Sequence, residues 1–150
     1  MQLTAYTDYA LRVLMYLAVH EERLVTISEM ATAYNISKNH LMKIVHQLGQ
    51  KGFIETIRGR SGGLRLGQPP TQLALGQIVR QMEPHFNIVE CFEPTTNHCP
   101  ITPACGLARV LVEARDAFLA VLDRYTLADL IPDKHALAYL FEGRSSHALP

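Results

Sequence analysis

Three cysteines, Cys91, Cys99 and Cys105, lie in one short segment with the spacing C-x7-C-x5-C, and the chain contains no others. The segment CFEPTTNHCPITPACGL is rich in proline and threonine, which predicts an irregular loop that runs into a helix. Three thiolates can hold a metal ion or a cluster, but they leave one coordination position to another ligand. A centre of this kind is open to reaction, so the fourth ligand decides what the loop can do.

The residues themselves offer several fourth ligands. His98 is next to Cys99, and His85 and Glu90 lie shortly before Cys91. Zinc held by three thiolates and a histidine or carboxylate would also satisfy the pattern. A thiol oxidoreductase usually needs a C-x-x-C pair or an activated nucleophile beside a base, and neither motif is recognisable here. The sequence therefore predicts a metal-binding protein that is not an enzyme.

The rest of the composition is that of an ordinary globular chain, with 48 % hydrophobic and 19 % charged residues. Charge appears too early in the N-terminal segment, at Asp8 and Arg12, for a signal peptide. The longest apolar stretch, from Val13 to Val19, is too short to cross a bilayer. We therefore expect a cytoplasmic protein without a membrane partner, in which cysteines favour metal binding over disulfides.

Three predicted helices precede the cysteine segment. Apolar residues recur at helical spacing from about Thr7 to His20. Thr26 and Glu29 match a capping box that opens a short second helix, and Asn35 suits the turn after it. Ser37 is expected to cap a third helix, whose buried stripe would be Leu41, Ile44, Val45 and Leu48. This order of elements predicts a helix-turn-helix.

The outer face of the third helix favours DNA recognition. It presents cations and amides without a carboxylate: Lys38, Asn39, His40, Lys43, His46 and Gln47. Cations bind phosphates and amides read base edges, whereas a merely solvated helix face normally mixes both signs of charge. We assign the DNA contacts of this helix to Ser37, Lys38, Asn39, His40 and Lys43.

A basic hairpin follows the third helix. Phe53, Ile54 and Ile57 suggest one strand, and Leu64 and Leu66 suggest another. The tip Arg58-Gly59-Arg60-Ser61-Gly62-Gly63 lies between them. Between Ser37 and Leu66 there are six Lys or Arg residues and one acid, whereas acids outnumber bases after Gly67. The glycines precede a strand and no GK[ST] follows, so a nucleotide loop is disfavoured. The hairpin is predicted to be a wing that contacts DNA through Arg58, Arg60, Ser61 and Arg65.

The C-terminal half is predicted to be helical around the cysteine loop. A helix is expected from about Leu75 to Glu83, and a long amphipathic helix from about Cys105 to Tyr125. The long helix would be a dimerisation arm, and Thr126 with Asp129 would cap a short turn after it. The fold class is mainly α with a small β-wing. The divisions are a winged helix-turn-helix domain (1–83), a cluster-binding loop (84–105), a dimerisation helix (105–131) and a tail without strong pattern (132–150).

Several of these segments together resemble the IscR/NsrR family of winged-helix iron–sulfur transcription regulators. They are MQLTAYTDYALRVLMYLA, SKNHLMKIV, RGRSGGLRL, VECF, CPITPAC and TLADL, and they cover nearly the whole chain up to about Ile131. The match is closest to the nitric-oxide-sensitive repressors of the family. It implies a homodimer on double-stranded operator DNA, in which nitric oxide, the signal, attacks the cluster and releases the DNA of nitrosative-stress genes.

The resemblance also implies a ligand set. Cys91, Cys99 and Cys105 would bind a [4Fe–4S] cluster, with the partner subunit's Asp8 as fourth ligand and Arg12 as the residue that orients it. IscR-like members instead hold a [2Fe–2S] cluster with three cysteines and a histidine, and the wider spacing between Cys91 and Cys99 argues against them. An IscR-like regulator of iron–sulfur or iron homeostasis, and a zinc-stabilised regulator without sensing, remain the alternatives.

Overall fold

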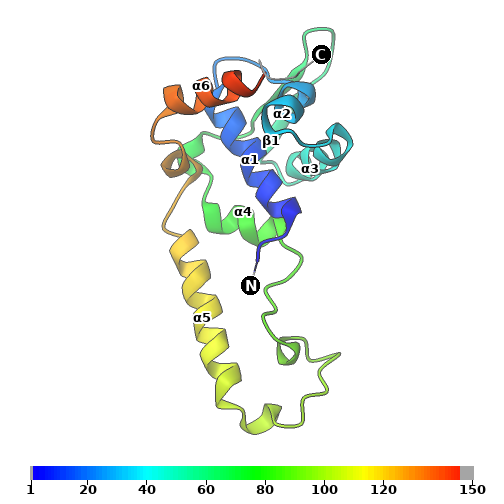
Figure 1. Ribbon diagram of the computed structural model, residues 1–150, viewed down its shortest axis with the longest axis vertical. Coiled ribbons are helices and arrows are strands. Elements are labelled where there is room, and N and C mark those ends of the chain that lie inside the picture. Colours follow the sequence, from blue (N-terminus) through cyan, green and yellow to red (C-terminus); the bar gives the residue numbers. More distant parts are fainter. Residues whose placement is uncertain (1, 146–150) are drawn as a thin grey trace.

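The computed structural model describes residues 2–145 of the chain. It is mainly helical, with one small sheet (Figure 1). The helices are α1 (Ala5–Val19), α2 (Ile27–Tyr34), α3 (Lys38–Gln50), α4 (Leu75–Met82), α5 (Gly106–Leu122) and α6 (Lys134–Ser145), and the strands are β1 (Ile54–Ile57) and β2 (Gly63–Leu66). Short 3₁₀ turns are η1 (Pro70–Gln72), η2 (Glu90–Phe92), η3 (Thr102–Ala104) and η4 (Leu127–Leu130). None of the described helices combines the length and hydrophobicity needed to span a bilayer.

Helix α1 is the centre of the hydrophobic core, and the helix-turn-helix packs on it. Val13, Leu14 and Leu17 of α1 are almost completely buried against α3 and its neighbours. The predicted capping box is confirmed, because the Thr26 hydroxyl accepts from the Glu29 amide and the Glu29 carboxylate accepts from the Thr26 amide. Asn35 adopts the expected left-handed conformation, with φ of 54°. These local signals set the angle between α2 and α3.

Helix α3 buries the predicted stripe, Leu41, Ile44, Val45 and Leu48. Its start differs from the prediction in one detail. Ser37 occupies the N-cap position, but its side chain makes no capping hydrogen bond. The Ser37 hydroxyl therefore accepts no hydrogen bond from the backbone amides of the first turn of α3. The Ser37 side chain is exposed at the N-terminal end of α3, which was predicted to contact DNA.

Strands β1 and β2 form the predicted antiparallel wing, with Ile54 opposite Leu66 and Ile57 opposite Gly63. Its tip depends on two glycines. Gly59 has φ of 120°, which disfavours any residue with a side chain. A Cβ atom on Gly62 would lie 2.2 Å from the carbonyl oxygen of Ile57. The Arg/Gly tip is thus a defined tight turn, which fixes the backbone positions of Arg58 and Arg60.

Helix α5 leaves the body of the protein as an arm (Figure 1). None of its residues is buried, and Leu107, Val110, Val121 and the following Tyr125 are all exposed apolar side chains. Its C-terminal end is attached to the body of the protein by hydrogen bonds and an ion pair. There the Leu75 amide donates to the Tyr125 carbonyl, the Leu127 amide donates to the Leu73 carbonyl, and Arg80 forms a two-point ion pair with Asp123.

The tail from residue 132, which shows no strong sequence pattern, forms a helix in the part that the structure describes. Residues 134–145 form α6, which packs across α1 and α2 (Figure 1). Phe141 is 8 % exposed and contacts the rings of Tyr16 and Tyr34. Residues 146–150 of that tail lie outside the described residues. Helix α6 therefore packs against the helix-turn-helix, and Phe141 is part of the same hydrophobic core as residues of α1.

Candidate DNA interface and cysteine loop

The surface of α3 carries the side chains that were assigned to DNA. Lys38, Asn39 and Lys43 are exposed, and His40 is half-buried. The His40 ring contacts Tyr9 edge-on, with ring centroids 5.3 Å apart, and lies 6.3 Å from Tyr6. Its ring is therefore held by α1 instead of projecting freely. The structure presents a basic, carboxylate-free helix face that could enter a DNA groove.

Tyr6 is a residue of this surface that the sequence patterns did not identify. Its hydroxyl donates to the Lys43 carbonyl at 3.0 Å, and a hollow of about 400 Å³ lies between Tyr6, Asn39, His40 and Lys43. Burial raises the pKa of Tyr6, so its hydroxyl stays protonated as a donor. Only the tertiary contact between α1 and α3 reveals this role, because the two segments are 37 residues apart.

The wing divides its cations into two kinds. Arg58, Arg60 and Ser61 are exposed at the tip, and neither of these arginines has an ion-pair partner among the described residues. Arg65 instead lies opposite Glu55 in the sheet, and its Nη2 is 2.7 Å from the Glu55 Oε2. This pair offsets much of the Arg65 charge, so the tip is the stronger site for a phosphate.

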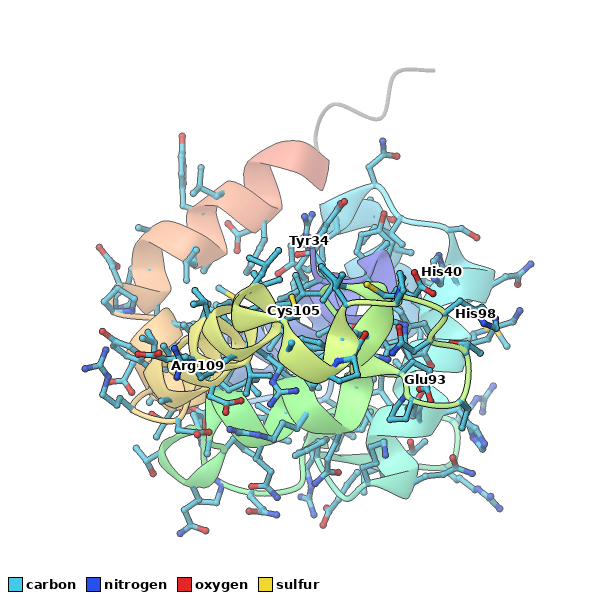
Figure 2. The ribbon with its side chains drawn as sticks, turned by 90° about the horizontal axis from the view of Figure 1, so that it is seen from below. Tyr34, His40, Glu93, His98, Cys105 and Arg109 are labelled. Carbon is cyan, nitrogen blue, oxygen red and sulfur yellow. The ribbon has the colours of Figure 1, made fainter. Side chains whose placement is uncertain are left out.

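The loop of residues 84–105, which carries the three cysteines, lies at the end of the molecule opposite α6 and leads into α5 (Figure 1). All three are free thiols and half-buried. Cys91 is in η2, and Cys105 directly precedes α5 as its N-cap residue. Figure 2 views the molecule from this end and shows Cys105 well separated from His98 on the loop.

The rival ligands in the loop are only partly available. The Glu90 Oε1 accepts from the His98 backbone amide at 2.6 Å, so this carboxylate already bridges two parts of the loop. The His85 Nδ1 lies 3.4 Å from the Asn87 amide. Among residues 2–145, no three His, Cys, Asp or Glu side chains converge as a metal site in the single chain. A complete site would need the loop to close, or a ligand from elsewhere.

Asp8 lies in a different region, on the exposed side of α1. Its carboxylate is 2.7 Å from the Arg12 guanidinium, so the pair expected one helical turn apart is confirmed. Both side chains are 43 % exposed and border a hollow of about 550 Å³ that also includes Tyr9, Tyr34 and Asn35. The structure does not bring Asp8 and the cysteines together in one chain, and its role as a ligand remains a prediction.

Tyr34 of α2 contacts Arg12, the partner of Asp8 in this ion pair. Its hydroxyl donates to the Arg12 carbonyl at 3.0 Å, and the Arg12 guanidinium lies 6.0 Å from its ring centre. Burial raises the pKa of Tyr34 far above its ordinary value, which keeps the donor protonated. Tyr34 is the last residue of α2, directly before the turn of the helix-turn-helix. The Asp8 region is therefore in contact with the DNA-binding motif.

The donor chemistry of the loop fits an iron–sulfur cluster. Thiolates are the usual ligands of such clusters, and the loop offers three of them unpaired. A carboxylate is a harder and weaker ligand for the remaining iron than a thiolate would be. The donors fit the group by type, while their final arrangement would require a movement of the loop or a second chain.

Comparison with known proteins agrees with this combination of parts. Residues 3–133 match the model of the Rrf2 family, described as an iron-dependent transcriptional regulator. The chain is 53 % identical to the HTH-type transcriptional regulator NsrR of Bacillus subtilis, over 95 % of this chain and 98 % of that protein. It is 51 % identical to the NsrR of Geobacillus kaustophilus, over 96 % and 99 % of the two chains.

Solved structures give the same fold. CymR, the global cysteine regulator of B. subtilis, matches with a TM-score of 0.67 and 28 % identity, over 87 % of this chain and 95 % of that one. T. potens IscR matches with a TM-score of 0.70 and 23 % identity, over 91 % and 90 % of the chains, which supports the fold alone. The predicted winged helix and the absence of an enzymatic role are both confirmed. The chain belongs to the Rrf2 family of DNA-binding transcriptional regulators.

Proposed function

We propose that this chain is a repressor of the NsrR type, which senses nitric oxide through an iron–sulfur cluster held by Cys91, Cys99 and Cys105. One observation supports the proposal most directly: three free thiols and a winged helix-turn-helix occur on a chain that is about half identical to NsrR regulators over nearly its full length. Its targets would be genes that respond to nitrosative stress.

DNA binding would use two surfaces of the domain. Lys38, Asn39, His40 and Lys43, with Ser37 at the end of the helix, would meet the major groove. The tip of the wing, Arg58, Arg60 and Ser61, would contact phosphates or the minor groove. Arg65 would contribute less than the tip, since Glu55 is already within 2.7 Å of it.

The sensor would be completed between two chains. Cys91, Cys99 and Cys105 of one chain would hold the cluster, a [4Fe–4S] cluster with [2Fe–2S] as the alternative, and the partner subunit's Asp8 would be the fourth ligand. When bound, the cluster supplies iron atoms that react with nitric oxide. Asp8 is suited to a reversible role, because its exposed carboxylate can exchange between the partner's loop and Arg12 at 2.7 Å.

Helix α1 would transmit the state of Asp8 to the DNA-binding surface. Tyr9 follows Asp8 and contacts His40, and Tyr6 donates to the Lys43 carbonyl. A shift of α1 on loss of the ligand would therefore displace two DNA-contacting residues of α3. Dimerisation through the exposed apolar face of α5 would double this effect, since two recognition helices must match two half-sites.

Anaerobic purification of the full-length chain tests the proposal. We expect a coloured dimer that contains iron and sulfide, binds operator DNA, and loses both its visible absorption and its DNA on addition of nitric oxide. Mössbauer spectroscopy would assign the cluster as [4Fe–4S] or [2Fe–2S]. A colourless protein with stoichiometric zinc would overturn the proposal that an iron–sulfur cluster is the sensor. DNA binding that is unchanged by nitric oxide would overturn the proposal that nitric oxide is the signal.

A further inference from the structure

A closed set of hydrogen bonds surrounds the backbone of the middle cysteine. The Asn97 Oδ1 accepts from the Cys99 amide at 3.0 Å, and the Asn97 Nδ2 donates to the Thr102 Oγ1 at 3.0 Å. The Thr102 hydroxyl in turn donates to the Cys99 carbonyl at 2.9 Å. Three residues therefore form a ring, in which both polar backbone groups of Cys99 are bound by side chains.

The ring lies in a segment that has little other means of order. Residues 97–102 contain no α-helix or strand, and the surrounding residues His98 and Pro100 are exposed. Asn97, Cys99 and Thr102 are the half-buried members, which shields their hydrogen bonds from water. The Cys99 carbonyl also accepts from the Thr102 backbone amide at 3.3 Å, so the side-chain hydrogen bonds add to a backbone turn and give the Cys99 amide a partner.

A further hydrogen bond ties this ring to the first cysteine. Glu90, directly before Cys91, accepts from the His98 amide at 2.6 Å, and His98 lies between Asn97 and Cys99. The Cys91 turn and the Cys99 turn are thus joined across the loop by a hydrogen bond from a backbone amide to the Glu90 side chain. All of these contacts join groups of the chain itself.

We propose that Asn97 and Thr102 are positioning residues that hold the Cys99 turn ready for the cluster, so that less chain entropy is lost when its thiolate binds. The proposal rests on the proposed iron–sulfur site but adds two residues to it that provide no ligand. Residues that orient metal ligands in this way change metal affinity by about tenfold to a hundredfold when they are removed.

Substitutions that differ by single groups test the ring. Thr102→Val has nearly the same shape but lacks the hydroxyl, and Asn97→Ala lacks the side-chain amide with both its acceptor Oδ1 and its donor Nδ2. Thr102→Ser keeps the hydroxyl and should restore wild-type behaviour. Thr95→Val is the matched control, because the Thr95 hydroxyl donates to Glu93 in the same loop and to no group of a cysteine. None of these residues lies in the buried core, so the thermal transition should be unchanged.

Two measurements are made on the full-length protein. The first follows loss of visible absorption after an iron chelator is added to the anaerobically loaded dimer. Thr102→Val and Asn97→Ala should lose the cluster about tenfold faster than wild type, whereas Thr102→Ser and Thr95→Val should match it. The second is hydrogen exchange of the Cys99 amide in the metal-free chain, which should be protected in wild type and unprotected in Asn97→Ala.

The outcomes separate this proposal from the one it rests on. If wild type loads iron and sulfide but Thr102→Val retains them as long as wild type does, the positioning role is overturned while the sensor stands. If wild type takes up no cluster at all, both proposals fail together. Fast exchange of the Cys99 amide in metal-free wild type would overturn the ring as a feature of the unloaded chain.

Discussion

The Arg12 guanidinium lies 2.7 Å from the Asp8 carboxylate on the exposed side of α1. A surface pair of this kind, with both side chains 43 % exposed, stabilises a fold by at most about 1 kcal/mol. Breaking it is therefore inexpensive, which allows Asp8 to change partners. Asp8 would then have two roles, as the ion-pair partner of Arg12 and as a cluster ligand. Because the ion pair adds so little to the stability of the fold, a large loss of cluster in an Asp8 variant would report on the ligand role.

Asp8→Ala should leave the thermal midpoint of the metal-free chain within a few degrees of wild type, because the exposed pair contributes so little. In the loaded dimer the variant should lose its visible absorption several-fold faster on exposure to nitric oxide or chelator. Glu22→Ala, which removes an exposed carboxylate beyond the end of α1, is the control and should behave as wild type. Equal cluster lifetimes for Asp8→Ala and wild type would exclude Asp8 as a ligand.

Arg60→Ala should weaken operator binding at every sequence and lower the salt slope of the association constant by about one unit, because one phosphate contact is lost. Arg65→Ala should change the slope less, since Glu55 already offsets its charge. Fluorescence anisotropy with a labelled duplex at several salt concentrations measures both slopes. Identical slopes for Arg60→Ala and wild type would show that the wing tip does not contact phosphates.

The exposed apolar face of α5 should hold the dimer together. Leu107 and Val110 are 62 % and 55 % exposed, so the double variant Leu107→Glu/Val110→Glu removes no core contact. We expect a folded monomer in sedimentation experiments, with operator affinity at least tenfold weaker because two half-sites are no longer bound together. Arg109→Ala on the same helix should stay dimeric. A double variant that remains a dimer would move the interface elsewhere.

The sequence patterns predicted those parts of the fold that depend on near neighbours. The capping box was predictable because Thr26 and Glu29 lie within one helical turn of each other. The left-handed conformation of Asn35 and the buried stripe of α3 were predictable because they too depend on local sequence. The wing was predictable because alternating strands flank a glycine-rich tip.

Other features depend on contacts between distant segments and could not be predicted in this way. Phe141 is buried only because Tyr16 and Tyr34, more than a hundred residues earlier, form a socket for it, so the helical tail has no strong pattern of its own. The contact between Tyr6 and Lys43 and the pairing of Asn97 with Thr102 have no periodicity that a pattern could detect. The three cysteines that we propose as metal ligands could be recognised in the sequence, but the arrangement of their side chains in the folded loop could not.

Phe141→Ala should destabilise the chain by about 3 kcal/mol, because it leaves a cavity among the rings of Tyr16 and Tyr34. Tyr139→Ala, on the same helix but 75 % exposed, should change the free energy of unfolding by less than about 0.5 kcal/mol. Urea unfolding of the metal-free chain compares the two. A small effect of Phe141→Ala would mean that α6 is not part of the cooperative core.

Glu29 makes the start of α2 sensitive to acid. Burial alone would raise the pKa of its carboxyl, but hydrogen bonds from Thr26 and the Arg23 guanidinium 2.7 Å away outweigh it, and the net pKa is lowered. Because the folded-state pKa lies below the unfolded one, this stabilisation is present above the ordinary carboxyl pKa and is lost as the pH falls through the folded value.

Glu29→Gln isolates this effect. Glutamine can still accept the Thr26 amide in a capping box but carries no charge to titrate, so it removes only the part that depends on ionisation. We expect the variant to be less stable than wild type at pH 7, with the difference closing as the pH approaches 3, in urea unfolding of the metal-free chain. A difference that stays constant between these two pH values would show that the Glu29 charge does not stabilise the helix-turn-helix.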